Sequence, residues 1–392
     1  MNTVALEKFA VPAGGSVDPS KYPSEEFDLY SIPAYDKYEP EVSQGSEIGS
    51  TKKTVQPGDV LLSRIVPHIR RVWVVGPSRG RRQVGSGEWI IFRGDSFDSN
   101  YLRHMLMADP FHKQFMQTVA GVGGSLLRAR PSEVEKIKIP LPPLPEQKRI
   151  AAILDKADAI RRKRQQTVKL TEELLRSVFL DMFGDPVTNP KGWETCCLGD
   201  VIQKIESGWS PVCEEGQAEE NKWGVLKLGA VTTCRYLDTE SKSLPAGTSP
   251  RPELEVMAGD LLFTRKNTYD LVAASALVYA TRPKLMLSDL IFRLKLKDDS
   301  AVISEYLWAL LSNEGKRKQI QSLAGGSSGS MPNISKSKLM EQMIEVPPML
   351  LQKKYANILH LNRNVRIKLE AASQTSDSLF TSLLQQAFRG EL

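Results

Sequence analysis

The chain has 392 residues, of which 41% are hydrophobic and 25% are charged. This balance is usual for a protein that folds around a core and excludes a wholly disordered chain, and the length exceeds one ordinary domain of roughly 100–200 residues. The net charge of +6 is a mild basic excess, which supports nucleic-acid binding only weakly by itself.

Membrane and secretory patterns are not found in the sequence. No stretch approaches the ~18 uninterrupted apolar residues of a membrane span. The first residues, MNTVALEKFAVPAGG, lack an apolar segment of the length that secretory signals have. We therefore expect a soluble, cytoplasmic protein.

The first part of the chain is rich in short strand patterns. Residues 72–75 and 89–92 are apolar, β-branched or aromatic and are bounded by glycine and proline, which predicts strands. A helical pattern follows at 100–118, then a Gly-rich loop at 120–125 and one more strand. Prolines at 140, 142, 143 and 145 cannot continue a strand or a helix interior, so we expect the first domain to end at residue 144.

Arginines are concentrated in this first part. The segment 61–87 contains six arginines and no acidic residue. A run like this is often a solvated loop, but the planar guanidinium also suits phosphate oxygens and guanine edges. Composition leaves both interpretations open.

Two long proline-free segments, 147–183 and 352–388, alternate polar and apolar residues as a heptad does. Each predicts a helix about 55 Å long, and we expect the two to pair with each other, two separate core helices being the alternative. The predicted seam of the second helix is Tyr355, Ile358, Asn362, Val365, Leu369, Ala372, Ser376, Leu379 and Leu383. The seam of the first lies 205 positions earlier, at Ile150, Ile153, Ala157, Ile160, Arg164, Thr167, Thr171, Leu174 and Val178.

Basic residues also occur on the first long helix. The run 161–164 (RRKR) is either a solvated face, which we favour, or a contact with phosphates. Arg164 falls on the predicted seam, which indicates a polar contact with the second helix near Leu369.

The chain contains an internal repeat. The segment 56–64 (QPGDVLLSR) recurs at 257–265 (MAGDLLFTR), 120–125 (AGVGGS) at 324–329 (AGGSSG), and 137–143 (IKIPLPP) at 343–348 (MIEVPP). Residues 290–294 and 304–323 repeat the strand and helix patterns of the first half. Similar features in one order, at offsets of 201 to 205, indicate a duplicated unit.

These patterns together predict an α+β fold with a pseudo-twofold internal repeat. Two β-rich domains with short helices are separated by two long helices that pair as an antiparallel coiled coil. The expected divisions are the first domain at 1–144, the central helix at 145–184, the second domain at 185–348 and the C-terminal helix at 349–392.

Catalytic and metal-binding patterns are missing. The four cysteines (Cys196, Cys197, Cys213 and Cys234) form no CxxC pair and the four histidines are scattered, so we expect reduced, buried thiols. The adenine methyltransferase signature and the phosphate loop GxxxxGK[ST] do not occur. The glycine-rich residues 121–125 lack the strand and the acidic residue of a dinucleotide site. We expect a binding protein.

Three segments resemble a known family. Residues 139–151 (IPLPPLPEQKRIA), residues 179–186 (FLDMFGDP) with Gly192-Trp193-Glu194 after them, and residues 384–392 (LQQAFRGEL) are similar to the specificity (S) subunits of type I restriction–modification systems. The resemblance covers essentially the whole chain, and the combination of motifs is specific.

The resemblance implies a noncatalytic subunit in which two target-recognition domains each read half of an asymmetric, interrupted sequence in double-stranded DNA. The paired helices would set the gap between the halves. Two modification subunits would bind S-adenosylmethionine and methylate adenine N6, and restriction subunits that use ATP and Mg²⁺ can join; this chain itself would hold no cofactor or metal. The docking residues expected for the modification subunits are Pro142, Pro143, Gln147, Pro347, Pro348 and Gln352.

Candidate DNA-contacting residues are basic or polar residues of loops. In the first domain they are Arg64, His68, Arg70, Arg71, Arg79, Arg81, Arg82, Arg128 and Arg130, and in the second they are Arg265, Lys266, Asn267, Tyr269, Arg282 and Lys284. Arginine pairs with guanine and asparagine with adenine, each contact contributing about 1–3 kcal/mol of discrimination. A phosphate contact or a solvent-facing charge is the alternative for each residue.

Two other functions are alternatives to this one. A stand-alone DNA-binding scaffold or regulator that recruits another enzyme is the main alternative, and an autonomous nuclease is a third. Because the two domains differ in sequence, we expect the two half-sites to differ as well.

Overall fold

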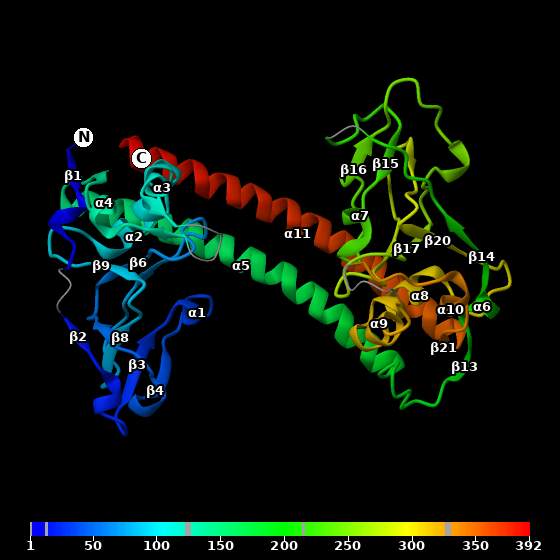
Figure 1. The fold of residues 1–392 in the computed structure, drawn as a ribbon, viewed down its shortest axis with the longest axis horizontal. Helices are drawn as coiled ribbons and strands as arrows, with labels where there is room; N and C mark the ends of the chain where they lie inside the picture. The colour runs from blue at the N-terminus through cyan, green and yellow to red at the C-terminus, as the bar shows by residue number, and fades with distance from the viewer. Residues whose placement is uncertain (1, 12–14, 122–126, 214–215, 326–330) are drawn as a thin grey trace. The chain divides into compact units, whose positions relative to one another are not determined.

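The computed structural model of the chain describes residues 2–11, 15–121, 127–213, 216–325 and 331–392. Contacts divide the chain into unit 1 (Met1–Thr167 with Leu369–Leu392) and unit 2 (Val168–Lys368). Each unit combines one domain with part of both long helices, α5 (Leu144–Phe183) and α11 (Met349–Arg389) (Figure 1).

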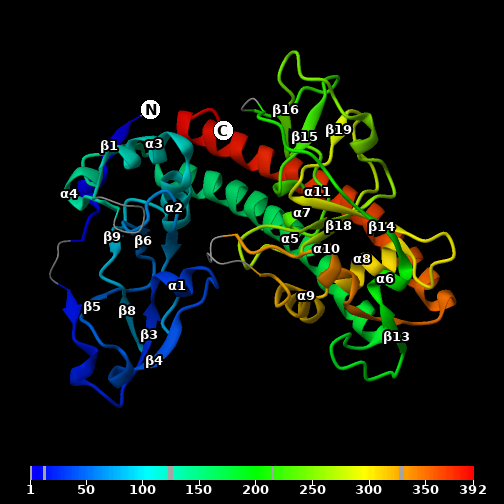
Figure 2. The same cartoon turned by 45° about the vertical axis from the view of Figure 1, so that its right-hand side comes forward.

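The domain of unit 1 contains two main sheets (Figure 2). One has five strands in the order β2-β5-β8-β3-β4, with β3 and β8 parallel, and the other is antiparallel in the order β7-β6-β9. Two further antiparallel pairs are β1-β12 and β10-β11. The strands are β1 (Thr3–Ala5), β2 (Ser16–Val17), β3 (Glu26–Tyr30), β4 (Glu41–Gln44), β5 (Lys52–Thr54), β6 (Val60–Ser63), β7 (Val72–Val74), β8 (Arg82–Gly85), β9 (Trp89–Phe92), β10 (Val119–Ala120), β11 (Arg128–Ala129) and β12 (Lys138–Pro140). The short helices are α1 (Ile32–Tyr35), α2 (Ser99–Met107), α3 (Asp109–Gln117) and α4 (Pro131–Val134).

The domain of unit 2 follows a related plan. An antiparallel sheet has the order β14-β20-β17-β18, a second sheet has the order β16-β15-β19 with β15 and β19 parallel, and β13 pairs with β21. The strands are β13 (Glu194–Cys197), β14 (Ile202–Ser207), β15 (Gly224–Leu226), β16 (Ser241–Ser243), β17 (Leu261–Thr264), β18 (Ser275–Leu277), β19 (Leu285–Met286), β20 (Ile291–Leu296) and β21 (Met343–Val346). The short helices are α6 (Leu198–Val201), α7 (Gly229–Thr232), α8 (Ser304–Ser312), α9 (Glu314–Gln321) and α10 (Lys336–Met340).

The sheet β7-β6-β9 is buried on both faces, which explains its unbroken apolar strands. Alternate residues face opposite sides. One side packs in a cluster with α2 and α3, through Val60, Leu62, Ile90, Phe92, Leu102 and Phe111. The other packs against aromatic residues, through Leu61, Trp73, Trp89, Ile91, Tyr30 and Tyr35. The strands expected at 72–75, 89–92 and 290–294 are therefore confirmed as β7, β9 and β20 to within one or two residues.

The helical stretches expected at 100–118 and 304–323 are each two helices. The break falls at Ala108 in unit 1 and at Asn313 in unit 2, where the backbone is extended. Pro110 occupies the first turn of α3, a position that proline favours because it lacks an N–H. The Asn313 side chain instead caps α9 by accepting hydrogen bonds from the backbone N–H groups of Gly315 and Lys316.

The repeated Gly-Asp sequence forms the same turn before the central strand of each unit. Gly58 has a φ of +88°, a conformation that glycine adopts readily. The carboxylate of Asp59 accepts a hydrogen bond from the backbone N–H of Gln56 (2.9 Å) and an ion pair from Arg93 (2.6 Å). The corresponding residues of unit 2 are Gly259, Asp260, Met257 and Arg293. The motif recurs in both units because it closes a turn and pairs the aspartate carboxylate with an arginine, Asp59 being buried and Asp260 half-buried.

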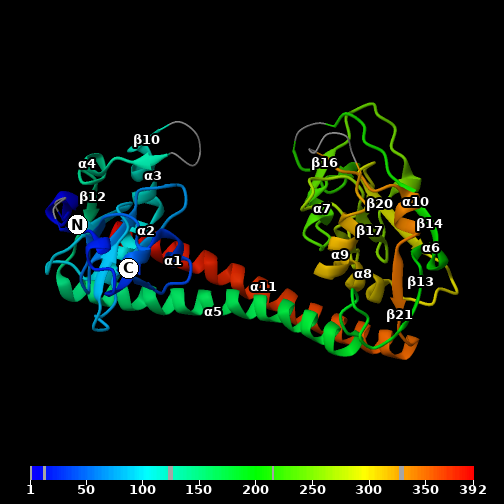
Figure 3. The same ribbon diagram turned by 60° about the horizontal axis from the view of Figure 1, so that its bottom comes forward.

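Segments of α5 and α11 run antiparallel in each unit (Figure 3). In unit 1, Arg149 contacts Leu392 and Arg164 contacts Ala372. Residue numbers therefore increase along α5 as they decrease in the C-terminal segment, so the two run in opposite directions. In unit 2, Asn362 donates a hydrogen bond to the carbonyl of Thr171 (3.2 Å). The predicted polar contact of Arg164 is confirmed, although its partners are the carbonyl of Ala372 (2.8 Å) and the hydroxyl of Ser376.

The predicted seam is only partly buried. Ile160, Leu174, Val365 and Leu379 were assigned to it, yet all four are exposed. Each helix packs against a domain as well as against the other helix, so its buried face is turned toward that domain. The buried positions include Leu154, Asp158, Phe179, Leu359, Phe380 and Leu384.

The run 161–164 is also not the solvated face that we favoured. Arg161 and Arg162 both pair with Asp158, at 2.7 and 2.8 Å, and Arg162 stacks on the ring of Tyr38. Only Lys163 of this run is exposed.

A buried glutamine joins the first turn of α5 to the domain of unit 1. Gln147 is 1% exposed, and its amide nitrogen donates to the carbonyls of Pro142 (2.8 Å) and Ser96 (3.2 Å). Its amide oxygen accepts a hydrogen bond from the backbone N–H of Asp98 (2.8 Å). One side chain thus ties the proline junction and the segment before α2 to the helix.

Gln352 makes the same contacts in unit 2. Its amide nitrogen donates to the carbonyls of Pro347 (2.8 Å) and Ala301 (2.9 Å), and its oxygen accepts from the backbone N–H of Ile303 (3.0 Å). We call these two sets of contacts the amide clamps.

The amide clamps correct the docking role expected for both glutamines. Because the two side chains are buried and bonded within their own units, they are not available to a partner, and a structural role replaces the docking role. Pro142 and Pro347 are buried as well, whereas Pro143 and Pro348 are exposed.

Replacing either clamp glutamine should destabilise its own unit. Gln147→Ala or Gln352→Ala removes three hydrogen bonds and leaves buried backbone groups without partners, so we expect the free energy of unfolding to fall by about 2–3 kcal/mol. Urea denaturation followed by circular dichroism measures this. Lys148→Ala and Lys353→Ala, at the exposed neighbouring positions, are matched controls with expected changes within about 0.5 kcal/mol. Equal effects of the buried and exposed substitutions would contradict the clamp.

Candidate nucleic-acid interface

A polar cluster lies where β6 ends in unit 1. Arg64 and Arg128 share the carboxylate of Glu88, with contacts of 3.0 Å from Arg64 and 3.1 Å from Arg128. The backbone brings them together, because Arg64 donates its N–H to the carbonyl of Glu88 and Ala129 donates to the carbonyl of Arg64. All three side chains are partly exposed, so the cluster is open to a ligand.

The cluster carries a net positive charge at neutral pH. Burial alone would raise the pKa of Glu88, but the hydrogen bonds and charges of Arg128 and Arg64 outweigh it, so the pKa of this carboxyl lies below its usual value of 4.5. Two arginines around one ionised carboxylate leave one unit of positive charge, which favours a phosphate or an electronegative base edge.

The same backbone arrangement recurs in unit 2 with different side chains. Arg265 occupies the place of Arg64, donating its N–H to the carbonyl of Leu290 and accepting from the N–H of Ile334. Asn333, 205 positions after Arg128, accepts a hydrogen bond from the guanidinium of Arg265 (3.1 Å). An arginine–asparagine pair therefore replaces the arginine–glutamate–arginine cluster.

Neither Glu88 nor Asn333 was identified from the sequence. The 205-residue offset that relates Gln147 to Gln352 also relates Arg128 to Asn333. This offset could have identified Asn333 from the sequence as the counterpart of Arg128. The loop residues 122–125, considered and rejected as a cofactor site, lie outside the described residues, although Gly121 is described.

The remaining basic candidates of unit 1 lie apart from this cluster, and most are paired with acidic residues. Arg79, Arg81 and Arg82 make ion pairs with Glu39, Glu26 and Glu25 at 3.1, 2.7 and 2.6 Å. The arginines at 79–82 belong to the segment 61–87, which has no acidic residue of its own. They are neutralised by carboxylates from segments that are distant in the sequence.

Four other candidates of unit 1 differ in their surroundings. Arg70 bonds Asp109 (2.7 Å) and the carbonyl of Met107, and Arg71 lies 3.9 Å from Asp36. Arg130 lies 3.4 Å from the carbonyl oxygen of Thr118, and His68 is exposed.

The candidates of unit 2 also divide by exposure. Asn267 is 7% exposed; its amide oxygen accepts a hydrogen bond from the N–H of Thr268 and its amide nitrogen donates to the hydroxyl of Thr232, so it is not presented to a base. Arg282 donates to backbone carbonyls that include Ala218 and Lys222, and Lys284 donates to that of Asn221. Lys266 forms a backbone bridge with Asn333, and Tyr269 is 57% exposed. Arg265, Lys266 and Tyr269 remain the candidates best placed for a ligand.

The described part of the chain contains no group of three or more His, Cys, Asp or Glu side chains arranged to hold a metal ion. None of its helices has both the length and the apolar character needed to cross a membrane. The four cysteines are half-buried free thiols, less buried than expected.

A duplicated α+β domain attached to antiparallel helices, with a polar cluster at the same place in each copy, defines a protein with two related binding domains. The family model for the type I restriction modification DNA specificity domain matches residues 90–171 and 190–376, more than half of the chain. The chain belongs to this family.

Two curated relatives are specificity subunits. The chain is 33% identical over 241 residues to the type I restriction enzyme EcoEI specificity subunit of Escherichia coli, covering 59% of this chain and 40% of the relative. It is 23% identical over 311 residues to the EcoKI specificity subunit of Escherichia coli strain K12, covering 75% and 66%. The matches thus span 40% to 66% of these relatives' lengths.

Solved structures share the fold along the chain. The S subunit of a type I restriction–modification system from M. genitalium has a TM-score of 0.59 at 11% identity, covering 99% of this chain and 96% of that one. A chain from a structural study of the assembly and conformational transition of a type I restriction–modification system has a TM-score of 0.55 at 21% identity, covering 100% and 98%. The predicted fold class is confirmed by this likeness.

The shared carboxylate of the unit 1 cluster predicts a pH-dependent stability difference. Because the pKa of Glu88 is lowered in the folded state, its stabilising effect is present above about pH 4.5 and is lost as the pH falls through the folded-state pKa. We expect Glu88→Gln to lower the free energy of unfolding by about 1–2 kcal/mol at pH 7, with a smaller difference at pH 4.

Urea denaturation at the two pH values tests this expectation. Glu133→Gln, which breaks the exposed pair between Glu133 and Lys136, is the matched control, and we expect it to leave stability almost unchanged at both pH values because solvent screens the pair. A Glu88→Gln effect that stayed constant from pH 7 to pH 4 would contradict the ionised cluster.

Proposed function

We propose that the chain is the DNA-specificity subunit of a type I restriction–modification complex, with one domain reading each half of a bipartite target. The observation that carries this proposal is the polar cluster found at one backbone position in both units, with Arg64, Glu88 and Arg128 in one and Arg265 with Asn333 in the other. The clusters occupy the same position in the two domains but consist of different side chains. This is what we expect of two related domains that read different bases.

The family membership supports this function over a stand-alone scaffold or regulator. We further propose that the subunit is noncatalytic, that S-adenosylmethionine is held by modification partners, and that ATP and Mg²⁺ are used by restriction partners. A DNA target is also in keeping with the cytoplasmic location expected from the sequence.

The helix pair of unit 2 offers a surface for a modification subunit. Thr171 and Asn362 mark the contact between the helices. The next residue on each helix contacts the domain. Glu172 of α5 pairs with Arg235, and Arg363 of α11 stacks on the ring of Tyr279. Leu170 and Leu361, the residues that precede Thr171 and Asn362, lie about 100° around each helix in the opposite direction. They are therefore on the face turned away from the domain.

That outer face is apolar and exposed. Leu170 and Leu174 on α5 are 53% and 54% exposed, and Leu361 and Val365 on α11 are 68% and 52% exposed. Since the helices are antiparallel, an equal rotation about each axis brings both pairs to the same side. Exposed apolar patches of this kind commonly mark protein–protein contacts, and we propose this one as the docking face in place of the clamp glutamines.

The main test is the genome's methylation pattern. Long-read mapping of N6-methyladenine, with and without this gene, should show loss of methylation at one asymmetric, interrupted motif. In the complemented strain, Arg64→Ala should weaken reading of one half-site and Arg265→Ala that of the other, by about tenfold or more for a residue that contacts a base.

Lys136→Ala, which changes an exposed basic residue of the same domain that is paired with Glu133 and is not a DNA-contacting candidate, serves as the control and should leave the motif unchanged. An unchanged methylome after deletion of the gene would contradict the specificity role. Loss of the same half-site in both variants would contradict the assignment of one domain to each half.

Charges on the outer helix face should prevent assembly. Leu361→Glu combined with Leu170→Glu would bury carboxylates in the proposed contact, so we expect the cognate modification subunit no longer to copurify, while circular dichroism stays unchanged. Leu237→Glu, at an exposed apolar residue of the domain, is the control and should copurify normally. Normal assembly of the double variant would rule out this docking face.

A further inference from the structure

The hairpin loops that join β6 to β7 and β17 to β18 lie beside the polar clusters. In the β6–β7 loop, Ile65 forms a backbone bridge with Arg128. In the β17–β18 loop, Lys266 forms the corresponding bridge with Asn333. Each loop is therefore tied at its start to a residue of the cluster in its own unit.

Each loop also exposes an apolar side chain. Ile69 of the β6–β7 loop is 43% exposed, and Tyr269 and Leu271 of the β17–β18 loop are 57% and 39% exposed. Apolar side chains next to cationic ones suit a ligand that offers both apolar and anionic surface. The major groove of DNA is such a ligand, because the 5-methyl group of thymine projects into it between the two phosphate backbones.

A helix holds the β17–β18 loop in place. Gln321 of α9 is buried, and its amide nitrogen lies 3.2 Å from three carbonyl oxygens of the loop, those of Tyr269, Asp270 and Val272. Arg317, one turn earlier on α9, donates to the carbonyls of Asp270 (3.0 Å) and Val272 (3.3 Å). The loop backbone is thus bonded to two side chains of the helix, while the Tyr269 side chain stays exposed.

The β6–β7 loop is fastened in unit 1 with the groups exchanged. Arg70 of the loop donates to the carbonyl of Met107 (2.9 Å) and pairs with Asp109 (2.7 Å), where α2 ends and α3 begins. In unit 2 the guanidinium belongs to the helix and the carbonyls belong to the loop. A guanidinium therefore joins loop and helix in both units, although the residues that supply it differ.

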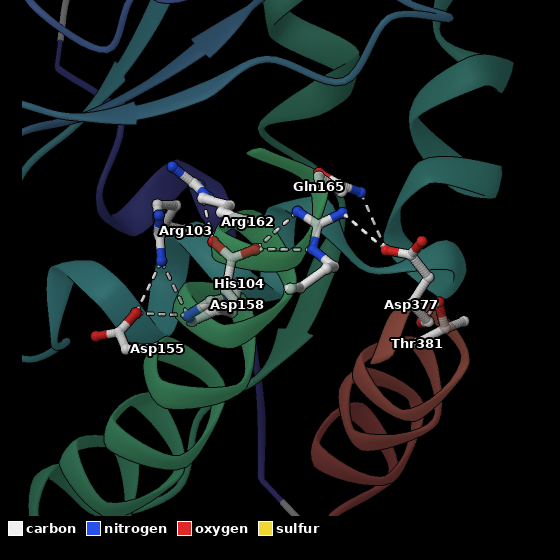
Figure 4. Close-up of polar contacts among 9 residues, drawn as sticks. Arg103, His104, Asp155, Asp158, Arg162, Gln165, Asp377 and Thr381 are labelled. Atoms are coloured by element: carbon white, nitrogen blue, oxygen red, sulfur yellow. Dashed lines mark hydrogen bonds and ion pairs between the residues drawn. The ribbon is translucent and has the colours of Figure 1, made fainter. Parts of the chain in front are cut away.

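These short helices are in turn fixed to the long helices. Arg103 and His104 of α2, which leads directly into α3, both lie 2.8 Å from a carboxylate oxygen of Asp155 on α5 (Figure 4). In unit 2, Glu305 of α8, which leads into α9, lies 3.3 Å from His360 of α11. Each loop consequently has a defined place relative to the long helix that packs on its domain.

We propose that Tyr269 and Ile69 determine specificity by contacting the 5-methyl group of a thymine, each in the half-site of its own domain. Arg317, Gln321 and Arg70 are the positioning residues that hold the two loops, so Arg70 is not itself a DNA contact. The assignment of one half-site to each domain rests on the proposed function. A loop that is fixed before binding loses little conformational freedom when it binds, which favours the contact.

Replacing thymine by deoxyuridine removes only the methyl group and so tests the contact. Every half-site with a methylated adenine also contains the thymine paired with it, so both halves offer a substitution. Duplexes that carry the mapped motif, with each thymine replaced in turn, are titrated with the complex purified through the full chain, and binding is measured by fluorescence anisotropy. We expect one replacement in each half-site to weaken binding about three- to fivefold, the effect of losing one buried methyl-sized group.

Variants of the loops should locate this contact. With Tyr269→Ala, binding to the unmodified duplex should fall by a similar factor and deoxyuridine in the half-site of unit 2 should have no further effect, whereas Tyr269→Phe should behave as the wild type. Ile69→Ala should abolish the deoxyuridine effect in the other half-site alone. Leu237→Ala, at an exposed apolar residue of unit 2 outside the loop, is the matched control and should keep both effects.

The positioning residues are tested by the ratio of binding to the thymine and deoxyuridine duplexes. Arg317→Ala and Gln321→Ala release the loop, so this ratio should approach one in the half-site of unit 2. Arg317→Lys keeps a cationic donor and should retain part of the ratio. Variants that lose stability in urea but keep the wild-type ratio would show a structural role only and would rule out positioning.

The thymine contact would be overturned if no deoxyuridine replacement weakened binding of the wild type, or if the effects persisted in Tyr269→Ala and Ile69→Ala. Loss of copurification of the modification subunit in Tyr269→Ala, with the deoxyuridine effects intact, would make the loop a protein contact and would also overturn it. Failure of the proposed function is distinguishable, because it leaves the methylome unchanged when the gene is deleted. A changed methylome with no deoxyuridine effect removes the thymine contact alone.

Discussion

The buried amide at the start of each long helix is the contact on which the rest of the architecture depends. A glutamine side chain has two donors and one acceptor oxygen, and both clamps use the amide nitrogen twice and the oxygen once on backbone groups. The backbone groups come from two separate segments, the proline junction and the stretch before α2 or α8, and the side chain that joins them comes from the helix. A domain that is held to its helix in this way keeps its polar cluster at a defined place on that helix.

Duplication preserved these backbone contacts while the side chains that face outward diverged. Three features are the same in both units: the Gly-Asp turn, the amide clamp, and the backbone hydrogen bonds of Arg64 and Arg265, the residues that follow β6 and β17. Each of them satisfies backbone or carboxylate groups. At the cluster itself no such requirement applies, and Arg128 in one unit corresponds to Asn333 in the other. The helix–domain junction diverged more strongly, since Asp158 and Arg363 have opposite charges at equivalent positions.

Charge distribution was where inference from the sequence was weakest. The arginines of 61–87 form an uninterrupted basic run in the sequence, but the sheet pairs β3 with β8 and brings Glu25 and Glu26 to Arg82 and Arg81, more than fifty residues away. Similarly, a heptad assignment considers only the partner helix, so it placed Leu174 and Val365 in the seam. The domain takes part of each helix's buried face, which leaves these residues exposed.

The sequence by itself determined the repeat, both long helices, the main strands and the family, because these depend on local periodicity, on proline and glycine, and on motifs that are read along the chain. It also placed a polar residue, Arg164, at the contact between the helices. Only the tertiary structure decided which cations are neutralised, that Gln147 and Gln352 are buried, and that Arg70 and Arg317 fasten loops to helices. Those properties depend on distances between segments far apart in the chain, and local sequence carries no record of such distances.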